Sequence, residues 1–155
     1  MNLTGNFLLV RLNKIMQFEK GGGMVKKVLP ASPTLFVQLL GIKSIGQFNK
    51  DDRTYTWQIN GLDKRAVNYF RTVHGGVIMG LLDDACGVTI YNCYGVNSAV
   101  TNKAESAFFK PLRPISSITI TCQILEETGN KIYLNSQLSS NNHLIAEMNA
   151  VWTRR

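Results

Sequence analysis

The sequence predicts an α+β fold in which an antiparallel sheet curves around one long central helix. Residues 75–92 form a long and almost wholly apolar segment at helical spacing, which must be covered on most sides. Four strand candidates follow, the last three of which alternate as strands do, and their hairpin-short connections make that part of the sheet antiparallel. A chain of 155 residues suits a single domain with one sizeable core.

Composition indicates a globular protein, since 45% of the residues are hydrophobic and 17% are charged. No apolar run approaches the roughly 18 residues that span a bilayer, and the run 7–10 is too short for a signal-peptide core. We therefore expect a cytoplasmic protein with no membrane insertion. The three cysteines lack paired spacing, so neither a disulfide framework nor a zinc site is expected.

The net charge of +7 is spread along the chain and forms no dense basic helix. The chain has no aromatic-rich basic motif of the RNA-binding kind, so no nucleic-acid partner is predicted. A diffuse positive field fits an anionic small ligand such as a nucleotide or coenzyme. A merely solubilising surface charge would explain the same pattern.

Residues 1–31 are expected to form a separate, partly ordered arm, because the segment is only modestly amphipathic and is interrupted by the glycines at 21–23. The folded domain is predicted to span 32–155. It begins with Ser32 and Pro33, an N-cap followed by proline at the first helical position. Apolar residues then repeat at helical spacing until Gly41, which can end this short helix.

Two strands are expected before the long helix, at 42–48 and 54–59, joined by a turn at 49–52. In the second of them Tyr55, Trp57 and Ile59 share one face. A loop over 61–73 leads into the long helix. Four strands follow, and the prolines of 110–114 separate the first from the rest: 99–109, 117–124, 132–138 and 144–152.

The start of the long helix is the first candidate site. Gly75 and Gly76 would leave unpaired N–H groups there, and the helix dipole adds partial positive charge. Such an end suits a carbonyl oxygen that gains negative charge during a reaction. Taken alone, the sequence His74-Gly-Gly also fits a tight structural turn.

Two adjacent carboxylates, Asp83 and Asp84, lie in the middle of this apolar helix, where burial is costly unless they are paired or have a chemical role. Each alone could be a solvated or paired side chain. Together with the glycine-rich helix start, they predict that one acts as a general base or nucleophile. Gly75 and Asp83 are separated by about 12 Å of helix rise. Both can act on one carbonyl only if the carboxylate comes from a second copy, so we expect a dimer with composite sites.

The residues that carry these features resemble the hotdog-fold acyl-CoA thioesterases of the PaaI type. Asn68 is followed after five residues by His74, Gly75 and Gly76, and Asp83 comes nine positions after the histidine. The resemblance extends over about 32–152. It implies an antiparallel sheet around a central helix, dimers that often form tetramers, acyl-CoA as the substrate and no cofactor.

The resemblance also implies a role for each matching residue. The N–H of Gly76 would polarise the thioester carbonyl, with Gly75 beside it at the substrate. Asp83 of the opposite subunit would activate water, assisted by the hydroxyl of Thr101. Asn68 would position the water or the carbonyl, and His74 would orient the turn. Two basic residues are candidates for the phosphates of coenzyme A: Lys110 and Arg113.

Two other functions are compatible with the same pattern. A non-catalytic acyl-CoA-binding or sensing protein would keep the fold, although the arm is too short for a convincing DNA-binding domain. A hotdog hydratase would need an Asp and His pair that the sequence does not show. Tyr69, Phe70 and Arg71 depart from the family, whose loop is usually smaller here, and Tyr69 and Phe70 with Met79 suggest an apolar acyl pocket.

Overall fold

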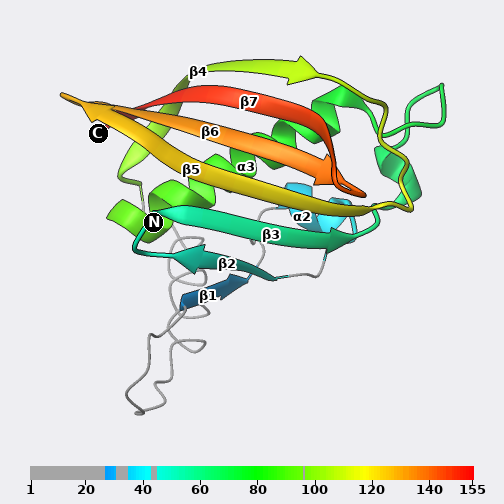
Figure 1. The fold of residues 1–155 in the computed structure, drawn as a ribbon, viewed down its shortest axis with the longest axis horizontal. Coiled ribbons are helices and arrows are strands. Elements are labelled where there is room, and N and C mark those ends of the chain that lie inside the picture. Colours follow the sequence, from blue (N-terminus) through cyan, green and yellow to red (C-terminus); the bar gives the residue numbers. More distant parts are fainter. Residues whose placement is uncertain (1–26, 31–34, 43–44, 96) are drawn as a thin grey trace, which may run out of the picture.

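The sheet of this protein curves around one long helix, as the sequence predicts (Figure 1). The computed structural model describes residues 27–30, 35–42, 45–95 and 97–155. Seven antiparallel strands follow one another in the order β1-β2-β3-β5-β6-β7-β4. The elements are β1 (Lys27–Pro30), α2 (Leu35–Leu39), β2 (Ile45–Asn49), β3 (Thr54–Asn60), the 3₁₀ helix η1 (Lys64–Ala66), α3 (Gly75–Tyr94), β4 (Ala99–Phe108), β5 (Ser117–Thr128), β6 (Lys131–Ser140) and β7 (His143–Arg154).

The first strand lies within the segment that the sequence assigned to the arm. β1 pairs with β2, with Lys27 opposite Phe48 and Pro30 opposite Ile45, so the sheet begins before residue 32. Residues 1–26 lie outside the described residues, and so do Ser32 and Pro33. The division at residue 31 and the N-cap before α2 therefore stay predictions.

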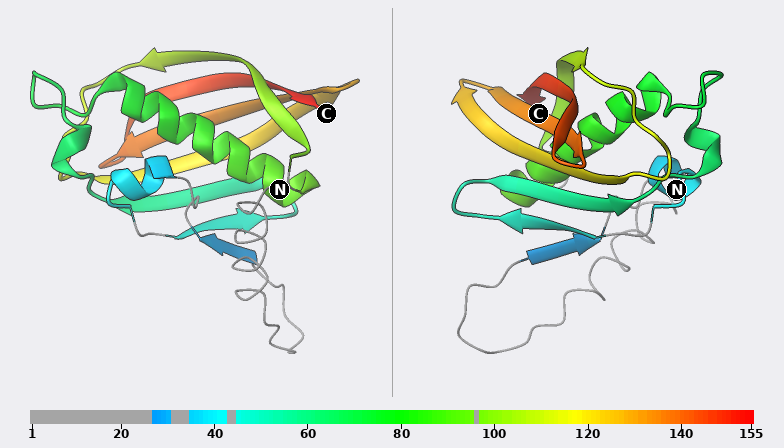
Figure 2. Two further views of the ribbon diagram at one scale, coloured as in Figure 1. Left: turned by 180° about the vertical axis from the view of Figure 1, so that it is seen from behind. Right: turned by 45° about the vertical axis from the view of Figure 1, so that its right-hand side comes forward.

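The core lies between the concave face of the sheet and α3 (Figure 2). On β3 the inward residues Tyr55, Trp57 and Ile59 are buried, which confirms the predicted alternation. β5 follows the same rule over four buried residues: Ile118, Ile120, Cys122 and Ile124. Alternating burial of this kind is typical of a sheet with one solvated face.

The helix buries only one side. Seven of its side chains are buried: Ile78, Leu81, Leu82, Ala85, Cys86, Thr89 and Ile90. Met79 on another side of the helix is exposed, and Asp83 and Asp84 are half-buried. The view from behind in Figure 2 shows α3 lying in front of the sheet on this side. The sequence predicted a helix covered on most sides, and a single chain does not provide all of that cover.

Glycine within α3 permits close packing by side chains of this same chain. A Cβ atom at Gly80 would lie 2.6 Å from the ring of Phe36, a residue of α2 that packs against α3. A Cβ atom at Gly87 would meet the ring of Trp152 at 3.4 Å. Packing against Phe36 therefore explains the glycine at 80, whereas the contact at 87 is an ordinary van der Waals distance that a Cβ atom would tolerate.

The cysteines are free thiols, and two of them meet in the core. The sulfur atoms of Cys86 and Cys122 are 3.7 Å apart and fully buried, while Cys93 is half-buried. Contact with Cys122 and burial raise the pKa of Cys86 well above its usual value. A buried thiol with a raised pKa is held as an inert hydrophobe.

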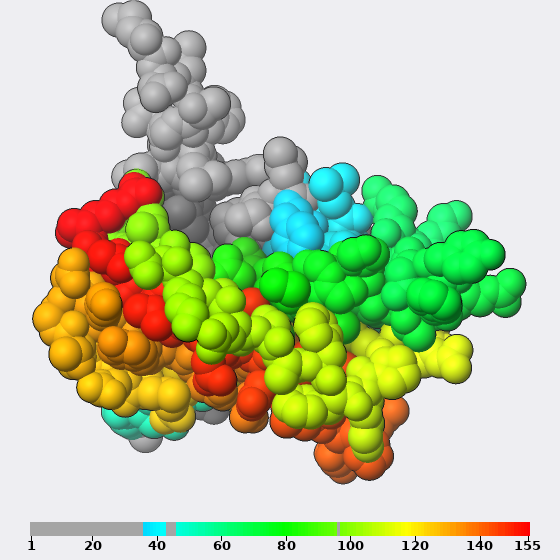
Figure 3. All heavy atoms as spheres, turned by 90° about the horizontal axis from the view of Figure 1, so that it is seen from above, coloured from blue at the N-terminus to red at the C-terminus, as the bar shows by residue number. Residues whose placement is uncertain are grey.

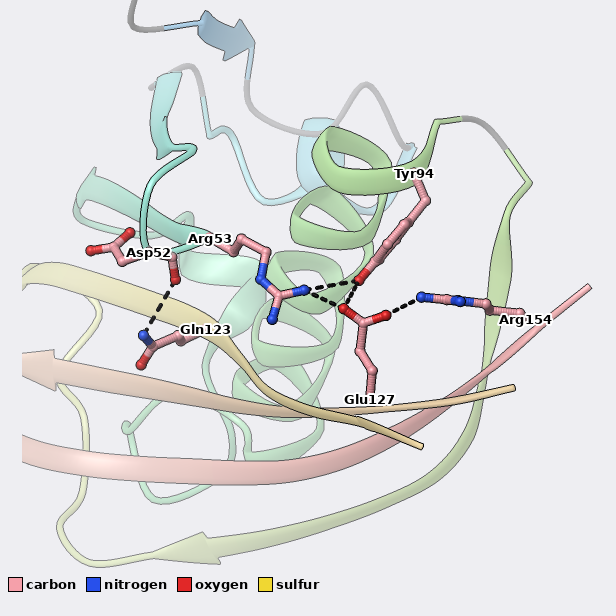
Figure 4. A network of polar contacts seen from close by, with 6 residues as sticks. All are labelled: Asp52, Arg53, Tyr94, Gln123, Glu127 and Arg154. Carbon is pink, nitrogen blue, oxygen red and sulfur yellow. Dashed lines mark hydrogen bonds and ion pairs between the residues drawn. The ribbon is translucent and has the colours of Figure 1, made fainter. Parts of the chain in front are cut away.

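A network of hydrogen bonds and ion pairs links the C-terminal end of α3 to the sheet (Figure 4). Glu127 on β5 accepts hydrogen bonds from Arg53 of the β2–β3 turn, from Tyr94 and from Arg154 at the end of β7. The guanidinium of Arg154 also lies 4.9 Å from the centre of the Tyr94 ring, close enough for a cation–π contact. One carboxylate thus connects the helix end, a turn and two strands.

Candidate active site

His74 forms the N-terminal cap of α3. Its backbone is extended, and its Nδ1 accepts a hydrogen bond of 3.0 Å from the N–H of Gly76. The Gly76 donor that the resemblance assigned to the substrate carbonyl is therefore already engaged by the histidine. No hydrogen bond within the described part of the chain uses the N–H of Gly75. The unpaired donor at the helix start is thus the neighbouring glycine.

Asn68 organises the loop that precedes the helix. Its Oδ1 accepts hydrogen bonds from the N–H of Phe70 at 2.9 Å and from the N–H and hydroxyl of Thr72, both at 3.2 Å. In the described residues the Nδ2 of Asn68 has no partner. Sequence reasoning missed this loop-forming role, although asparagine is a known turn residue because its side chain bonds the backbone two residues further on.

Asp83 contacts the edge strand. Its Oδ1 accepts a hydrogen bond of 2.9 Å from the hydroxyl of Thr101 on β4. The resemblance implied that these two residues act together, and in the structure they are in direct contact. Asp83 is half-buried, and its Oδ2 has no hydrogen bond to any other described residue. The carboxylate is therefore oriented by one oxygen and can accept a proton at the other.

Asp84 lies toward a different part of the sheet. Burial raises the pKa of Tyr55 on β3, and the negative charge of Asp84 raises it further. β3 and β4 are separated by three strands in the sheet order. The two aspartates, adjacent in the sequence, are thus directed to different environments, and Asp83 is the one beside the edge strand.

A pocket of about 360 Å³ opens at the start of α3. The helix start contributes Val73, Gly75 and Ile78 to its wall, and residues 108–112 form the rest. The ring of Phe108 would lie 3.6 Å from a Cβ atom at Gly75, so the strand end borders the unpaired N–H. Lys110 is in the wall, whereas Tyr69, Phe70 and Met79 are not. The sequence pointed to Lys110 and Arg113 only as phosphate ligands and did not predict that residues 108–112 form a pocket wall.

The two chemical features do not meet within one chain. Gly75 and Asp83 lie on the same helix, about 12 Å apart along its axis.

Arg113, the other predicted phosphate ligand, is exposed directly after the pocket wall. Within the ranges that the structure describes, no cluster of residues suited to a metal ion occurs. None of the described helices is long and apolar enough to cross a membrane.

Comparison with known proteins identifies the class of this arrangement. The model of the thioesterase superfamily matches residues 70–143, a span that holds the helix start, Asp83 and Thr101. No curated protein matches the sequence of the chain.

Solved structures share the architecture at low sequence identity. A mutant of the phenylacetic acid degradation protein PaaI from Thermus thermophilus superposes with a TM-score of 0.68 at 16% identity, over 79% of this chain and all 100% of that one. The PaaI protein of E. coli gives 0.65 at 18% identity, over 79% and 86%. A hypothetical thioesterase from Streptococcus pneumoniae, solved with coenzyme A, gives 0.59 at 13%, over 65% and 80%.

The protein is therefore a hotdog fold, and over 70–143 it carries the sequence pattern of the thioesterase superfamily. The resemblance to thioesterases of the PaaI type, which the sequence indicated, is confirmed.

Proposed function

We propose that this protein is an acyl-CoA thioesterase in which Asp83 activates water. The observation that carries the proposal is the hydrogen bond of 2.9 Å from Thr101 to Asp83. It orients a half-buried carboxylate that burial alone would disfavour, and it leaves one oxygen for a water molecule. The match to the thioesterase superfamily over the same residues supports this reaction class.

The reaction would use the carboxylate of Asp83 together with the N–H groups at the start of α3. Asp83 takes a proton from water, and the water oxygen attacks the carbonyl carbon of the thioester. Negative charge then builds up on the carbonyl oxygen, which the unpaired N–H of Gly75 and the shared N–H of Gly76 stabilise at the helix start. The tetrahedral intermediate collapses, the carbon–sulfur bond breaks, and the proton on Asp83 passes to the departing thiolate. The Nδ2 of Asn68 is the remaining donor that could hold the carbonyl or the water.

Two copies of the chain are needed to assemble this site. β4 ends the sheet, and apart from Ala99 and Ser106 its residues are exposed. A ten-residue edge strand with exposed backbone groups is a template for pairing with another strand. Pairing of two β4 strands would bring the exposed sides of two α3 helices together, so we propose a homodimer, or a tetramer of such dimers.

Coenzyme A is the proposed carrier of the acyl group. The pocket beside Gly75 is walled mainly by apolar groups, which suits the uncharged part of a thioester. Lys110 in that wall and the exposed Arg113 supply positive charge for phosphates, and the net charge of +7 attracts an anionic substrate. The pneumococcal neighbour was solved with coenzyme A. We also propose a cytoplasmic location.

Asp83→Asn tests the mechanism, with Asp84→Asn as the matched control one residue along the helix. We expect Asp83→Asn to lower kcat for acyl-CoA hydrolysis by about 10²- to 10⁴-fold, the usual contribution of a general base. Binding of coenzyme A, measured by calorimetry, should be kept. Asp84→Asn should keep most of the activity once its thermal stability has been checked.

Full activity in Asp83→Asn would exclude the mechanism. If the natural protein binds acyl-CoA of several chain lengths but hydrolyses none of them, the alternative of a non-catalytic acyl-CoA-binding or sensing protein is the correct one. A screen over acyl chains therefore forms the first part of the experiment.

A further inference from the structure

The loop 67–73 presents two aromatic rings to solvent at the end of the molecule where α3 begins. Tyr69 is 96% exposed and Phe70 is 81% exposed. Their ring centres are 5.9 Å apart and their planes meet at 84°, so the rings form an edge-to-face pair. The loop extends beyond the start of α3 in Figure 1, and the same part of the chain projects at one end of the molecule in Figure 3. Neither ring belongs to the pocket wall.

The backbone that carries the two exposed rings is held by hydrogen bonds of the loop. An antiparallel bridge joins Val67 to Val73 at the base. Above it, the N–H of Asn68 donates to the carbonyl of Thr72 at 2.8 Å, and the Asn68 side chain accepts the three hydrogen bonds described above. Arg71 has a φ of 60°, a left-handed conformation that costs a non-glycine residue about 1 kcal/mol. Because the backbone is already ordered, the loop loses little backbone freedom when a ligand stacks on the rings.

Positive charge surrounds the base of this loop. The N–H of Val73 donates to the carbonyl of Leu112 at 2.9 Å, so segment 108–116 lies beside the loop. Within 61–75 and 108–116 there are five basic residues, Lys64, Arg65, Arg71, Lys110 and Arg113, and one acidic residue, Asp63. Asp63 is paired with Arg65 at 2.8 Å. Four exposed cations are left without a carboxylate in these two segments.

We propose that Tyr69 and Phe70 form a stacking site for the adenine of the coenzyme A thioester, and that the surrounding cations bind its phosphates. Flat aromatic faces and nearby basic side chains are the combination that recognises a nucleoside phosphate. The inference rests on the proposed function, because it assigns the nucleotide end of the same substrate. These two rings do not serve as part of the acyl pocket.

The geometry of the loop suits this assignment. Val73 is at the base of the loop and in the wall of the pocket at the same time. The tip lies three residues further along a turn, so it is at most about 10 Å from Val73, the length of three residues of extended chain. The pantetheine arm separates the thioester from the nucleotide, so one ligand can reach from the helix start to the loop tip. Rings on this ordered loop add affinity without touching the reacting atoms.

The first experiment measures binding of adenosine 3′,5′-bisphosphate to the full chain by calorimetry. The double variant Tyr69→Ala/Phe70→Ala should raise Kd about tenfold, the scale of lost base stacking on alanine substitution. Ile115→Ala is the control, because Ile115 is an equally exposed apolar side chain, at 91%, outside the loop. Tyr69→Phe keeps the ring and should keep the affinity. An unchanged Kd in the double variant would overturn the proposal.

The second experiment compares acyl-CoA with the matching S-acyl-pantetheine, which lacks the nucleotide. The double variant should lower kcat/KM about tenfold for acyl-CoA and leave that for acyl-pantetheine unchanged. An equal loss for both substrates would contradict the proposal, and so would a change of oligomeric state in light scattering, since the loop would then be a subunit contact. If the natural protein hydrolyses no thioester, the proposed reaction fails while the bisphosphate measurement still decides this inference.

Discussion

The two adjacent aspartates show how one residue step along a helix changes the chemistry of a side chain. Successive residues on an α-helix point about 100° apart, so Asp83 and Asp84 cannot share one environment. Asp83 reaches Thr101 on the edge strand, whereas the charge of Asp84 acts on the buried phenol of Tyr55. The sequence could not choose between them from the apolar pattern, because both interrupt it equally.

Gly75 offers a direct test of the helix-start donor. Proline is favoured at the first helical position, and His74 before it already has the extended conformation that a residue preceding proline prefers. Gly75→Pro should therefore keep the helix and remove the unpaired N–H. We expect kcat for thioester hydrolysis to fall about 10²- to 10³-fold, as for other lost oxyanion donors.

Gly75→Ala separates the loss of the donor from the presence of a side chain. Its Cβ atom would meet the Phe108 ring at 3.6 Å, an ordinary van der Waals contact, and the N–H is kept. This variant should keep activity within a few-fold of the natural protein, measured in the same assay. Equal losses in the two variants would mean that space at the helix start matters, and that the N–H does not.

At the scale of elements, the long helix was predictable from its continuous apolar run, and three of the four C-terminal strands were predictable from their alternation. β5 alternates through four buried residues, and the structure agrees. β1 was not predicted, since four residues that end in Pro30 are too few to show alternation. The pocket could not be predicted either, because its wall joins Val73 and Ile78 to residues 30 or more positions later.

The network around Glu127 makes the C-terminal end of α3 sensitive to acid. The hydroxyl of Tyr94 and the guanidinium groups of Arg53 and Arg154 hold the pKa of Glu127 below its usual value of 4.5. A carboxylate with a lowered pKa in the folded state contributes its stability above the unfolded pKa and loses it as the pH falls through the folded pKa. Glu127→Gln should thus lower the free energy of unfolding by about 1 kcal/mol at pH 7.

Denaturant unfolding at several pH values measures this effect. The difference between the natural protein and Glu127→Gln should be constant from pH 6 to 8 and shrink below about pH 4.5. Glu126→Gln is the control on the same strand, because its carboxylate bonds the nearby hydroxyl of Thr128 and no arginine in the described chain. A difference between Glu127→Gln and the natural protein that is as large at pH 3 as at pH 7 would show that the charge of Glu127 is not responsible.

At the scale of the whole molecule, a single chain has both halves of the proposed site but cannot join them. The unpaired N–H of Gly75 and the oriented carboxylate of Asp83 are about two helical turns apart on one rigid element. The exposed side of α3 and the exposed edge of β4 lie next to each other, as Figure 3 shows from above. A two-fold axis beside β4 would place each helix start against the other subunit's aspartate.

Mixed dimers of Gly75→Pro and Asp83→Asn chains test this arrangement. With one substitution in each chain, a composite site made from the two unaltered halves is intact, so a purified mixed dimer should show about half the natural activity. With both substitutions in one chain and none in the other, every composite site has one altered half, and the mixed dimer should be inactive. If each site lay within one chain, the first mixed dimer would be inactive and the second would show about half the natural activity. Two differently tagged chains, co-expressed and purified through both tags, allow kcat to be measured for each combination, and light scattering confirms that the measured species is the dimer.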